Sequence, residues 1–230
     1  MKNVNSTRQG ATKVQSAVED YVKTIYSHTE WQPEPITPSV LAARLGLAAS
    51  SVTEMVKKLA AAGLVTHLPY GAITLTPEGR ALALRMLRRH RLIETWLIDS
   101  FGYTWDEVHD EAEVLEHALS DRLLEAIADR LGHPVRDPHG DPIPAVDGKV
   151  FQPEAVLLRD APDQHVGRIV RISDRDANLL RYLDAQSITL DTRLTVAGRK
   201  PFGGPLTVRL DDAEHDLGEE AAAAIWVSLD

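Results

Sequence analysis

The segment GHPVRDPHGDPIPAVDG, residues 132–148, constrains the fold of this chain more than any other stretch. It contains four prolines and three glycines. Proline has no backbone N–H to donate, so the segment can form neither a helix nor a central β-strand. Apolar residues before it recur at helical spacing, whereas those after it occur in short alternating runs. The sequence therefore predicts helical domains, then a linker, then a small β domain.

The N-terminal part begins with a polar stretch and two helical patterns. Residues 1–13 are expected to form a loose arm, and Ser16 is a candidate cap for a first helix. Pro38 occupies the favoured first turn of a short helix, which Gly46 ends. This order of elements is the start of a helix-turn-helix.

A second helix and a hairpin complete the pattern. Ser50 or Ser51 is expected to cap a helix that reaches about Ala62. Two short strands are predicted after it, Leu64–Thr66 and Ala72–Leu75, around the turn Pro69–Gly71. Helix, turn, helix and hairpin in this order predict a winged helix-turn-helix domain over residues 1–79.

The second of these helices carries the candidate contacts to double-stranded DNA. Such a helix enters the major groove by its N-terminal end, while hydroxyls and lysines hold phosphates. The predicted DNA-binding residues are Ser50, Ser51, Thr53, Glu54, Lys57 and Lys58. Glu54 is an unusual member, because phosphates repel a carboxylate unless it accepts from a cytosine amino group. The alternative is that these residues only cap and solvate a surface helix.

The distribution of charge supports a DNA partner although the net charge is −9. Residues 38–91 carry a balance of +6, whereas residues 92–130 carry −9. This asymmetry fits an anion-binding unit joined to a cation-binding unit. The chain has no cysteine, no apolar run of membrane-spanning length and no secretory signal pattern. We therefore expect a soluble, cytoplasmic protein with no membrane partner and no small-molecule substrate.

The acidic block contains ligand-type side chains at helical spacing. If residues 109–117 form a helix, four side chains share an arc of about 100°: His109, Glu113, Glu116 and His117. His90 and Glu94 stand four residues apart on the preceding helical pattern, so they also point one way. Histidine and carboxylate from two helices suggest a divalent-metal site. The alternative is a solvated, salt-bridged face with incidental histidines.

The remaining patterns complete the domain prediction. A helix from Arg80 to about Phe101 and another to about Leu131 have more apolar surface than one small domain covers, which predicts a homodimer interface. Five or so short strands are predicted after the linker, with a helix at Ala177–Leu183, as in a small barrel; they include Val166–Ile172, Ile188–Val196, Leu206–Leu210 and Ile225–Leu229. The expected divisions are a DNA-binding domain (1–79), a helical dimerisation and metal-binding domain (80–131), a linker (132–150) and a barrel (151–230).

Five segments in this order resemble the diphtheria toxin repressor family of metal-activated transcriptional repressors. They are Asp20–Tyr26, Ser51–Val56, Arg89–Glu94, Val108–Ala112 and Glu116–Ser120. The C-terminal stretch Asp174–Ala185 resembles the SH3-like, or FeoA-like, barrel of that family. The resemblance implies a mainly α protein with small β parts, in which a winged helix binds operator DNA and the central helices dimerise and bind metal.

The resemblance also implies which residues hold metal. Its primary, activating site matches Asp20, Glu113, Glu116 and His117. Its second site matches His90, Glu94 and His109, with a further ligand from the barrel, so two ions per subunit are expected. Arg175 falls where the iron-type repressors supply a barrel ligand, and because a guanidinium cannot bind a cation, Asp174 or Asp176 is expected to replace it.

The residue types at two of these positions favour manganese. Iron-responsive members have Met or Cys where this chain has Asp20 and Glu113, and the manganese-responsive branch has acids at both. Carboxylates with few imidazoles suit Mn²⁺, although Zn²⁺ binds such sites more tightly. We therefore expect a Mn²⁺-activated repressor of metal-uptake genes, with Fe²⁺, Co²⁺ or Zn²⁺ as possible substitutes.

Two alternatives stay open at this point. An iron- or zinc-dependent repressor of the same family has the same fold. A carboxylate-bridged dimetal enzyme is the alternative from another class, but it usually needs Glu-x-x-His pairs from a four-helix bundle, which the sequence lacks. We therefore expect no enzyme activity.

Overall fold

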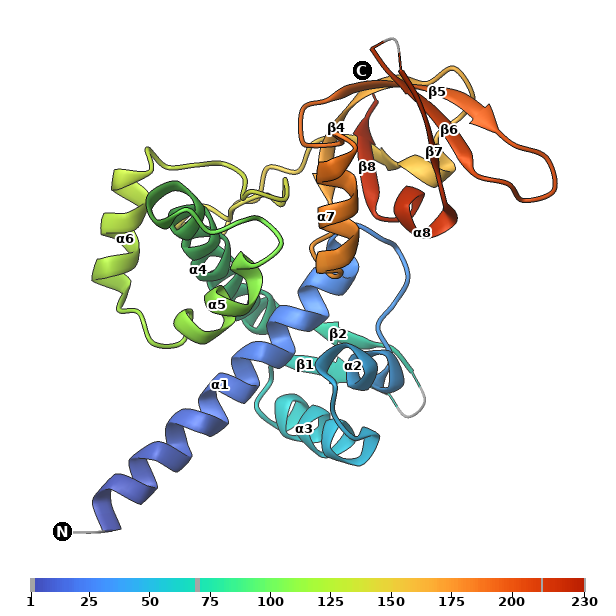
Figure 1. Ribbon diagram of the computed structural model, residues 1–230. Coiled ribbons are helices and arrows are strands. Elements are labelled where there is room, and N and C mark those ends of the chain that lie inside the picture. The colour runs from blue at the N-terminus through green and yellow to red at the C-terminus, as the bar shows by residue number, and fades with distance from the viewer. Residues whose placement is uncertain (1–2, 69–70, 212, 230) are drawn as a thin grey trace. The chain divides into compact units, whose positions relative to one another are not determined.

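The computed structural model describes residues 3–68, 71–211 and 213–229, which divide into two compact units (Figure 1). The first unit holds the chain up to Arg89 together with Pro144–Lys149. The second holds His90–Ile143 together with the chain from Val150 onward. The long helix α4 (Pro77–Phe101) contributes residues to both units.

The first unit is a winged helix-turn-helix, as the sequence predicts. Its helices and strands are α1 (Asn3–Glu30), α2 (Pro38–Leu45), α3 (Ala49–Ala61), β1 (Val65–His67) and β2 (Ile73–Leu75). The Thr37 hydroxyl caps α2 by accepting from the Val40 N–H, and Gly46 ends that helix in the left-handed conformation. Strands β1 and β2 pair antiparallel, with Val65 opposite Leu75.

Two local predictions in this unit are wrong. Helix α1 begins at Asn3 and not at Ser16; residues 3–15 contain no proline, so nothing stops the helix from extending through the expected arm. Helix α3 begins at Ala49, and its N-cap Ala48 makes no side-chain cap bond. The turn residues Pro69 and Tyr70 lie outside the described residues.

The first unit is held together by an apolar core and by one close backbone approach. Helix α1 packs against α2 and β2, and α2 packs against α3. The Thr76 hydroxyl donates to the Gly63 carbonyl and accepts from the Gly79 N–H, so it joins the end of α3 to the start of α4. Gly79 has no space for a side chain, because an added Cβ would lie 1.9 Å from the Leu64 carbonyl oxygen.

Within the described residues no single helix is long and apolar enough to span a membrane. The bent pair of α2 and α3 is the one combination of described helices that meets the length and composition limits when the two are taken together.

The second unit begins with a helical layer formed by the rest of α4, α5 (Val108–Leu115) and α6 (Asp121–Arg130). The prediction of one continuous helix to Leu131 is wrong. The Ser120 hydroxyl accepts from the Leu123 N–H and caps α6, so a new helix starts there. Glu116 ends α5, and His117 therefore lies in the turn between the two helices.

The β domain of the second unit is a six-stranded antiparallel sheet, which confirms the predicted small barrel. Its strands follow the order β3-β8-β4-β5-β6-β7. The elements are β3 (Ala155–Leu157), the 3-10 helix η1 (Leu158–Asp160), β4 (Val166–Ile172), α7 (Ala177–Ala185), β5 (Arg193–Arg199), β6 (Leu206–Leu210), β7 (Ala213–Leu217), α8 (Glu219–Ala222) and β8 (Ile225–Ser228). The ladder shifts register between Ile169 and Arg171 and again between Val196 and Gly198, which bends the sheet round its core.

The sequence predicts β4 and β6 to the residue, and β8 within one residue, but it misplaces or misses three strands. Residues 188–192 form no strand where the start of β5 is expected; a turn lies at residues 190–191, and Asp191 there has φ 63°. Strand β3 is only three residues long. Strand β7 reads AEHDL and lies at the edge of the sheet, so it has no alternating apolar pattern to detect.

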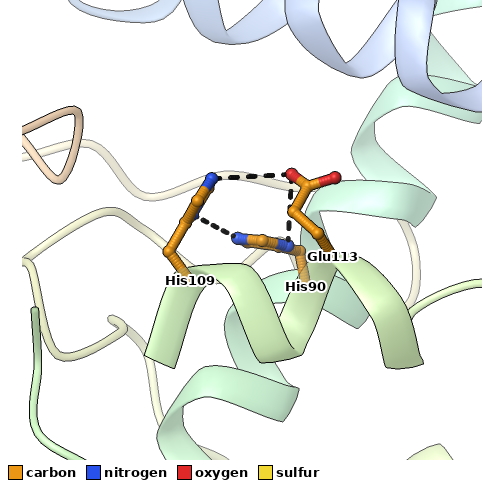
Figure 2. A group of neighbouring side chains, drawn as sticks. All are labelled: His90, His109 and Glu113. Atoms are coloured by element: carbon orange, nitrogen blue, oxygen red, sulfur yellow. Dashed lines mark hydrogen bonds and ion pairs between the residues drawn. The ribbon is translucent and has the colours of Figure 1, made fainter. Parts of the chain in front are cut away.

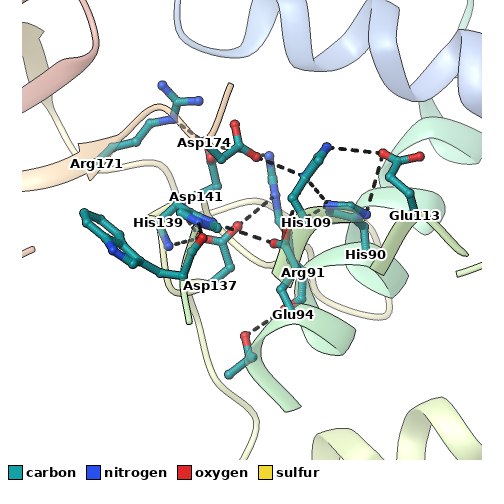
Figure 3. Close-up of polar contacts among 12 residues, drawn as sticks. His90, Arg91, Glu94, His109, Glu113, Asp137, His139, Asp141, Arg171 and Asp174 are labelled. Carbon is teal, nitrogen blue, oxygen red and sulfur yellow. Dashed lines mark hydrogen bonds and ion pairs between the residues drawn. The ribbon is translucent and has the colours of Figure 1, made fainter. Parts of the chain in front are cut away.

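The linker is a packed element between α4 and the barrel (Figure 3). Its residue Asp141 accepts from the Arg171 guanidinium of β4 at 2.7 Å, and Arg91 of α4 donates to the Pro142 carbonyl at 2.6 Å. The Ile172 N–H of β4 donates to the His139 carbonyl. Asp137, His139, Asp141 and both arginines are buried. Buried charges of this kind are stable only when paired, so this network fixes the linker to both neighbours.

Gly140 provides a test of this packing. It has φ 93°, and an added Cβ would lie 2.0 Å from the Val170 carbonyl oxygen of β4. Gly140→Ala should therefore lower the free energy of unfolding by about 3 kcal/mol or more, because the linker must move away from the barrel.

The matched control is Gly132→Ala, at φ 72° with nothing within 4 Å of its added Cβ. It should cost only the left-handed backbone strain, about 1 kcal/mol. Chemical denaturation of the two purified variants gives both values. Equal costs would contradict the packing of the linker on β4.

Candidate metal centre

The centre of the second unit is a group of histidines and carboxylates on α4 and α5. His90 and Glu94 lie one turn apart on α4, and His109 and Glu113 lie one turn apart on α5. Figure 2 shows His90, His109 and Glu113 turned toward one another. His90 Nε2 lies 2.9 Å from a Glu94 oxygen and 3.1 Å from His109 Nδ1. The structure thus brings together the three α-helical residues predicted for the second site.

His90 also reaches residues predicted for the primary site. Its Nδ1 lies 2.6 Å from Glu116 Oε2 and 4.0 Å from Glu113 Oε1. Glu116 is fully buried, and its other oxygen lies 3.5 Å from His117 Nε2. The His90 imidazole therefore contacts residues of both predicted ligand sets. Asp20, the remaining predicted primary ligand, lies on α1 in the first unit and is partly exposed.

The linker and the barrel add ligand-type residues to the same centre (Figure 3). Asp174, at the end of β4, places Oδ2 3.4 Å from His109 Nδ1. The linker residue His139 places Nδ1 3.9 Å from Glu94 Oε2. Two sets of three that include a linker or barrel residue have ligand atoms within 4.8 Å of one another, and Glu94 belongs to both: Glu94, Asp137 and His139; and Glu94, His109 and Asp174.

The orientation of His139 suits a metal ligand. Its Nε2 lies 2.7 Å from the Trp105 carbonyl oxygen, which can only accept, so Nε2 carries the hydrogen. The other ring nitrogen, Nδ1, is buried, and it has no hydrogen-bond partner among the described residues. A histidine that donates one ring N–H to a backbone carbonyl and turns its other nitrogen toward carboxylates has the usual arrangement of a metal-binding histidine. The donor set therefore fits a divalent cation.

Burial and neighbouring charges shift the pKa values of this group. Burial raises the pKa of Glu94, but His90, His109 and His139 together lower it well below its usual range. Burial, with the nearby carboxylates of Asp141 and Glu94, raises the pKa of Asp137 to about 7. The close carboxylates therefore repel one another, and a divalent cation would relieve this repulsion.

The two barrel candidates have different roles in the structure. The Asp176 carboxylate accepts from the Asn178 and Leu179 N–H groups and caps α7. Asp174 instead faces His109, at 3.4 Å. The exposed side chain of Arg175 lies between them in the sequence. The geometry therefore favours Asp174 as the barrel ligand.

Sequence reasoning missed Asp137 and His139. Both lie in the segment whose prolines and glycines predict a domain boundary, where the triplet Asp137-Pro138-His139 carries two ligand-type side chains. That triplet is the signal that could have identified them. Its position beside Glu94 depends on the folding of the linker, which local spacing does not predict.

The predicted DNA contacts lie together on the surface of α3. Ser50, Ser51, Thr53, Glu54, Lys57 and Lys58 are all exposed. The Thr53 hydroxyl donates to the Ala49 carbonyl inside the helix, and Lys57 donates to Glu54 at 3.0 Å. The helix thus presents a continuous polar surface opposite its buried face.

A winged helix-turn-helix joined to a cluster of imidazoles and carboxylates defines a metal-responsive DNA-binding regulator, and comparisons with known proteins agree. Residues 13–73 match the iron dependent repressor N-terminal DNA-binding domain. Residues 76–145 match the iron dependent repressor metal-binding and dimerisation domain, and residues 156–229 match the FeoA domain. The chain belongs to the diphtheria toxin repressor family and is a metal-dependent transcriptional repressor.

Individual relatives cover most of the chain. A solved structure described as a manganese-dependent transcriptional repressor in complex with manganese is 50% identical and covers 93% of this chain and 100% of that chain, with a TM-score of 0.89. The iron-dependent repressor IdeR of Mycobacterium bovis is 33% identical over 229 residues, which cover 91% of this chain and 95% of that protein. The diphtheria toxin repressor of Corynebacterium glutamicum is 37% identical over 153 residues, 66% of this chain and 64% of that protein. These matches confirm the predicted family and fold.

Metal stoichiometry tests the assignment of Asp174. Asp174→Asn should reduce the number of Mn²⁺ ions bound per subunit, because a carboxylate facing His109 is lost. Asp176→Ser is the matched control, since serine can still cap α7 while the neighbouring carboxylate is removed. Isothermal titration calorimetry measures the number of ions bound. Loss of an ion in the Asp176→Ser variant alone would reverse the assignment.

Proposed function

We propose that this chain is a cytoplasmic, Mn²⁺-activated repressor that binds operator DNA as a homodimer and controls metal-uptake genes. The observation that carries the proposal is the donor set of the second unit, which consists of carboxylates and imidazoles. The chain has no cysteine. Oxygen-rich sites with a minority of imidazole suit Mn²⁺, whereas thiolate and thioether ligands favour softer or later metals.

The relatives differ in their metals, and this difference supports the same choice. The solved structure that is 50% identical is described as manganese-dependent, whereas the relative that is 33% identical is described as iron-dependent. Glu113 is a carboxylate at a position where the iron-responsive pattern has sulfur, and it lies 3.6 Å from His109. Zn²⁺ still binds such a set more tightly than Mn²⁺, so selectivity depends on geometry or on supply in the cell.

We propose two ions per subunit. The primary set is Asp20, Glu113, Glu116 and His117, and the second set consists of His90, Glu94, His109 and Asp174 together with Asp137 and His139. Asp20 is assigned to the primary set by the sequence resemblance. Glu94, which belongs to two sets of ligand-type residues, is 1% exposed and is the central member of the second set.

Regulation follows from where the carboxylates lie. A bound divalent cation supplies the positive charge that lets these carboxylates stay together. Asp20 belongs to the same unit as α3, whereas Glu113, Glu116 and His117 belong to the second unit. Sharing one ion would restrict the DNA-binding unit to fewer arrangements, and a differential affinity of a few kcal/mol is enough to switch operator occupancy.

The affinity for operator DNA should depend on bound metal. With the full chain, we expect DNA affinity to rise at least about 10-fold with Mn²⁺ relative to a chelator-treated sample, the effect of about 1.4 kcal/mol of coupling. Fluorescence anisotropy with a labelled operator measures this, in parallel with Fe²⁺ under anaerobic conditions and with Zn²⁺. Equal affinity with and without metal would refute the mechanism, and activation by Fe²⁺ but not Mn²⁺ at cell-like concentrations would identify an iron-responsive repressor.

The role of Asp20 has its own test. Asp20→Ala should remove Mn²⁺ activation of DNA binding and leave the thermal unfolding temperature within a few degrees of the parent protein, because Asp20 is partly exposed. Glu19→Ala is the matched control, since Glu19 is the neighbouring, partly exposed acid on α1. Glu19→Ala should keep activation. Retained activation in Asp20→Ala would remove Asp20 from the site.

A further inference from the structure

Glu54 occupies the centre of the exposed face of α3. The buried residues of this helix are Val52, Val56 and Leu59. At 100° per residue they lie about 160°, −160° and 140° from Glu54, so its side chain points away from the core. Ser50 and Ser51 lie one turn before it on the same face, and Lys57 and Lys58 lie one turn after it.

This position has a consequence if α3 enters the major groove, as the proposed function requires. The residue opposite the buried face then reaches furthest toward the base edges, while its neighbours lie nearer the phosphates. A carboxylate at that depth is surrounded by negative charge. It is favourable only if it accepts hydrogen bonds there.

Lys57 favours a Glu54 side chain that accepts hydrogen bonds. Lys57 Nζ donates to Glu54 Oε1 at 3.0 Å, and this hydrogen bond lowers the pKa of Glu54 below its ordinary value. The side chain is therefore an ionised, accept-only group at neutral pH. The hydrogen bond uses Oε1, so Oε2 can accept from a base. Lys57 also places a positive charge beside the carboxylate, which reduces its repulsion by the phosphates.

The groups that donate in the major groove are the amino groups of cytosine and adenine. Adenine presents its N7 acceptor beside the amino group, which repels the second oxygen of a carboxylate and suits an amide instead. We propose that Glu54 reads the N4 amino group of one cytosine in each operator half-site, with Lys57 holding the carboxylate in place. This inference rests on the proposed function and adds a base preference to it.

A selection experiment tests the inference. The full chain loaded with Mn²⁺ is used to select operators from a random pool of duplex DNA, and the same is done with Glu54→Gln and Glu54→Ala. In each half-site, one position at which the parent protein prefers C·G by about 5- to 150-fold should become A·T in the Glu54→Gln variant, because glutamine can bond both N6 and N7 of adenine. In the Glu54→Ala variant the preference at that position should disappear.

Two control variants separate base reading from general electrostatics. Glu78→Gln makes the same charge change at an exposed residue in the first turn of α4, and it should leave the preference at every position unchanged. Lys58→Ala removes an exposed positive charge from α3 and should weaken binding to all sequences to a similar extent.

The outcomes distinguish this inference from the function on which it rests. If the parent protein selects no sequence with Mn²⁺ or any other divalent metal, the proposed function is wrong and the inference fails with it. If the parent selects an operator in a metal-dependent manner but both Glu54 variants keep its preference at every position, only the inference is overturned. That second result would leave the pair of Glu54 and Lys57 as a surface ion pair.

Discussion

The second unit depends on one buried carboxylate. Glu94 is 1% exposed, and a charge removed from water to that extent is stable only if opposite charges or hydrogen-bond donors surround it. Its partners come from three separate parts of the chain, namely His90 on α4, His109 on α5 and His139 in the linker. Satisfying this one group therefore brings two helices and the linker together.

The linker extends this arrangement to the barrel. Two arginines, Arg91 on α4 and Arg171 on β4, pair with Asp141 at 3.6 Å and 2.7 Å. Trp105 stacks on the ring of His139 and also packs against the barrel core. The residues that gather the ligand-type side chains are thus the residues that attach the barrel. This explains how Asp174, far along the chain, reaches His109.

Local patterns in the sequence predicted the elements that local interactions form. The winged helix-turn-helix follows from Pro38, Gly46 and a short hairpin, and strand β4 follows from its alternating β-branched residues. The break after α5 was missed, because the Ser120 cap competes with a helical pattern that continues on both sides of it. Strand β7 forms by pairing with β6 and carries little apolar signal of its own.

The sequence likewise predicted the site residues that share a helix, but not those that the linker brings to the site. The pairs at helical spacing, His90 with Glu94 and His109 with Glu113, were visible in the sequence because each pair lies on one helix. His139 was not, because its proximity to Glu94 depends on the folding of the linker. The choice between Asp174 and Asp176 likewise needed the structure, since only the geometry shows which of the two carboxylates caps α7.

The close approach of Gly140 to β4 has a consequence for how the protein responds to salt. Added salt screens exposed charges and reduces the free energy gained when lysines displace the counterions of phosphates. Under the proposed function, we therefore expect the affinity of α3 for DNA to fall steeply as ionic strength rises. The contact between Gly140 and the Val170 carbonyl depends on shape, and the neighbouring ion pairs are buried. The buried part of the barrel's attachment is therefore little affected by ionic strength, whereas the exposed ion pairs Arg136–Asp191 and Arg181–Asp106 are screened by salt. The same chain combines a salt-sensitive surface for its nucleic-acid partner with a salt-resistant interior around its ligand-type residues.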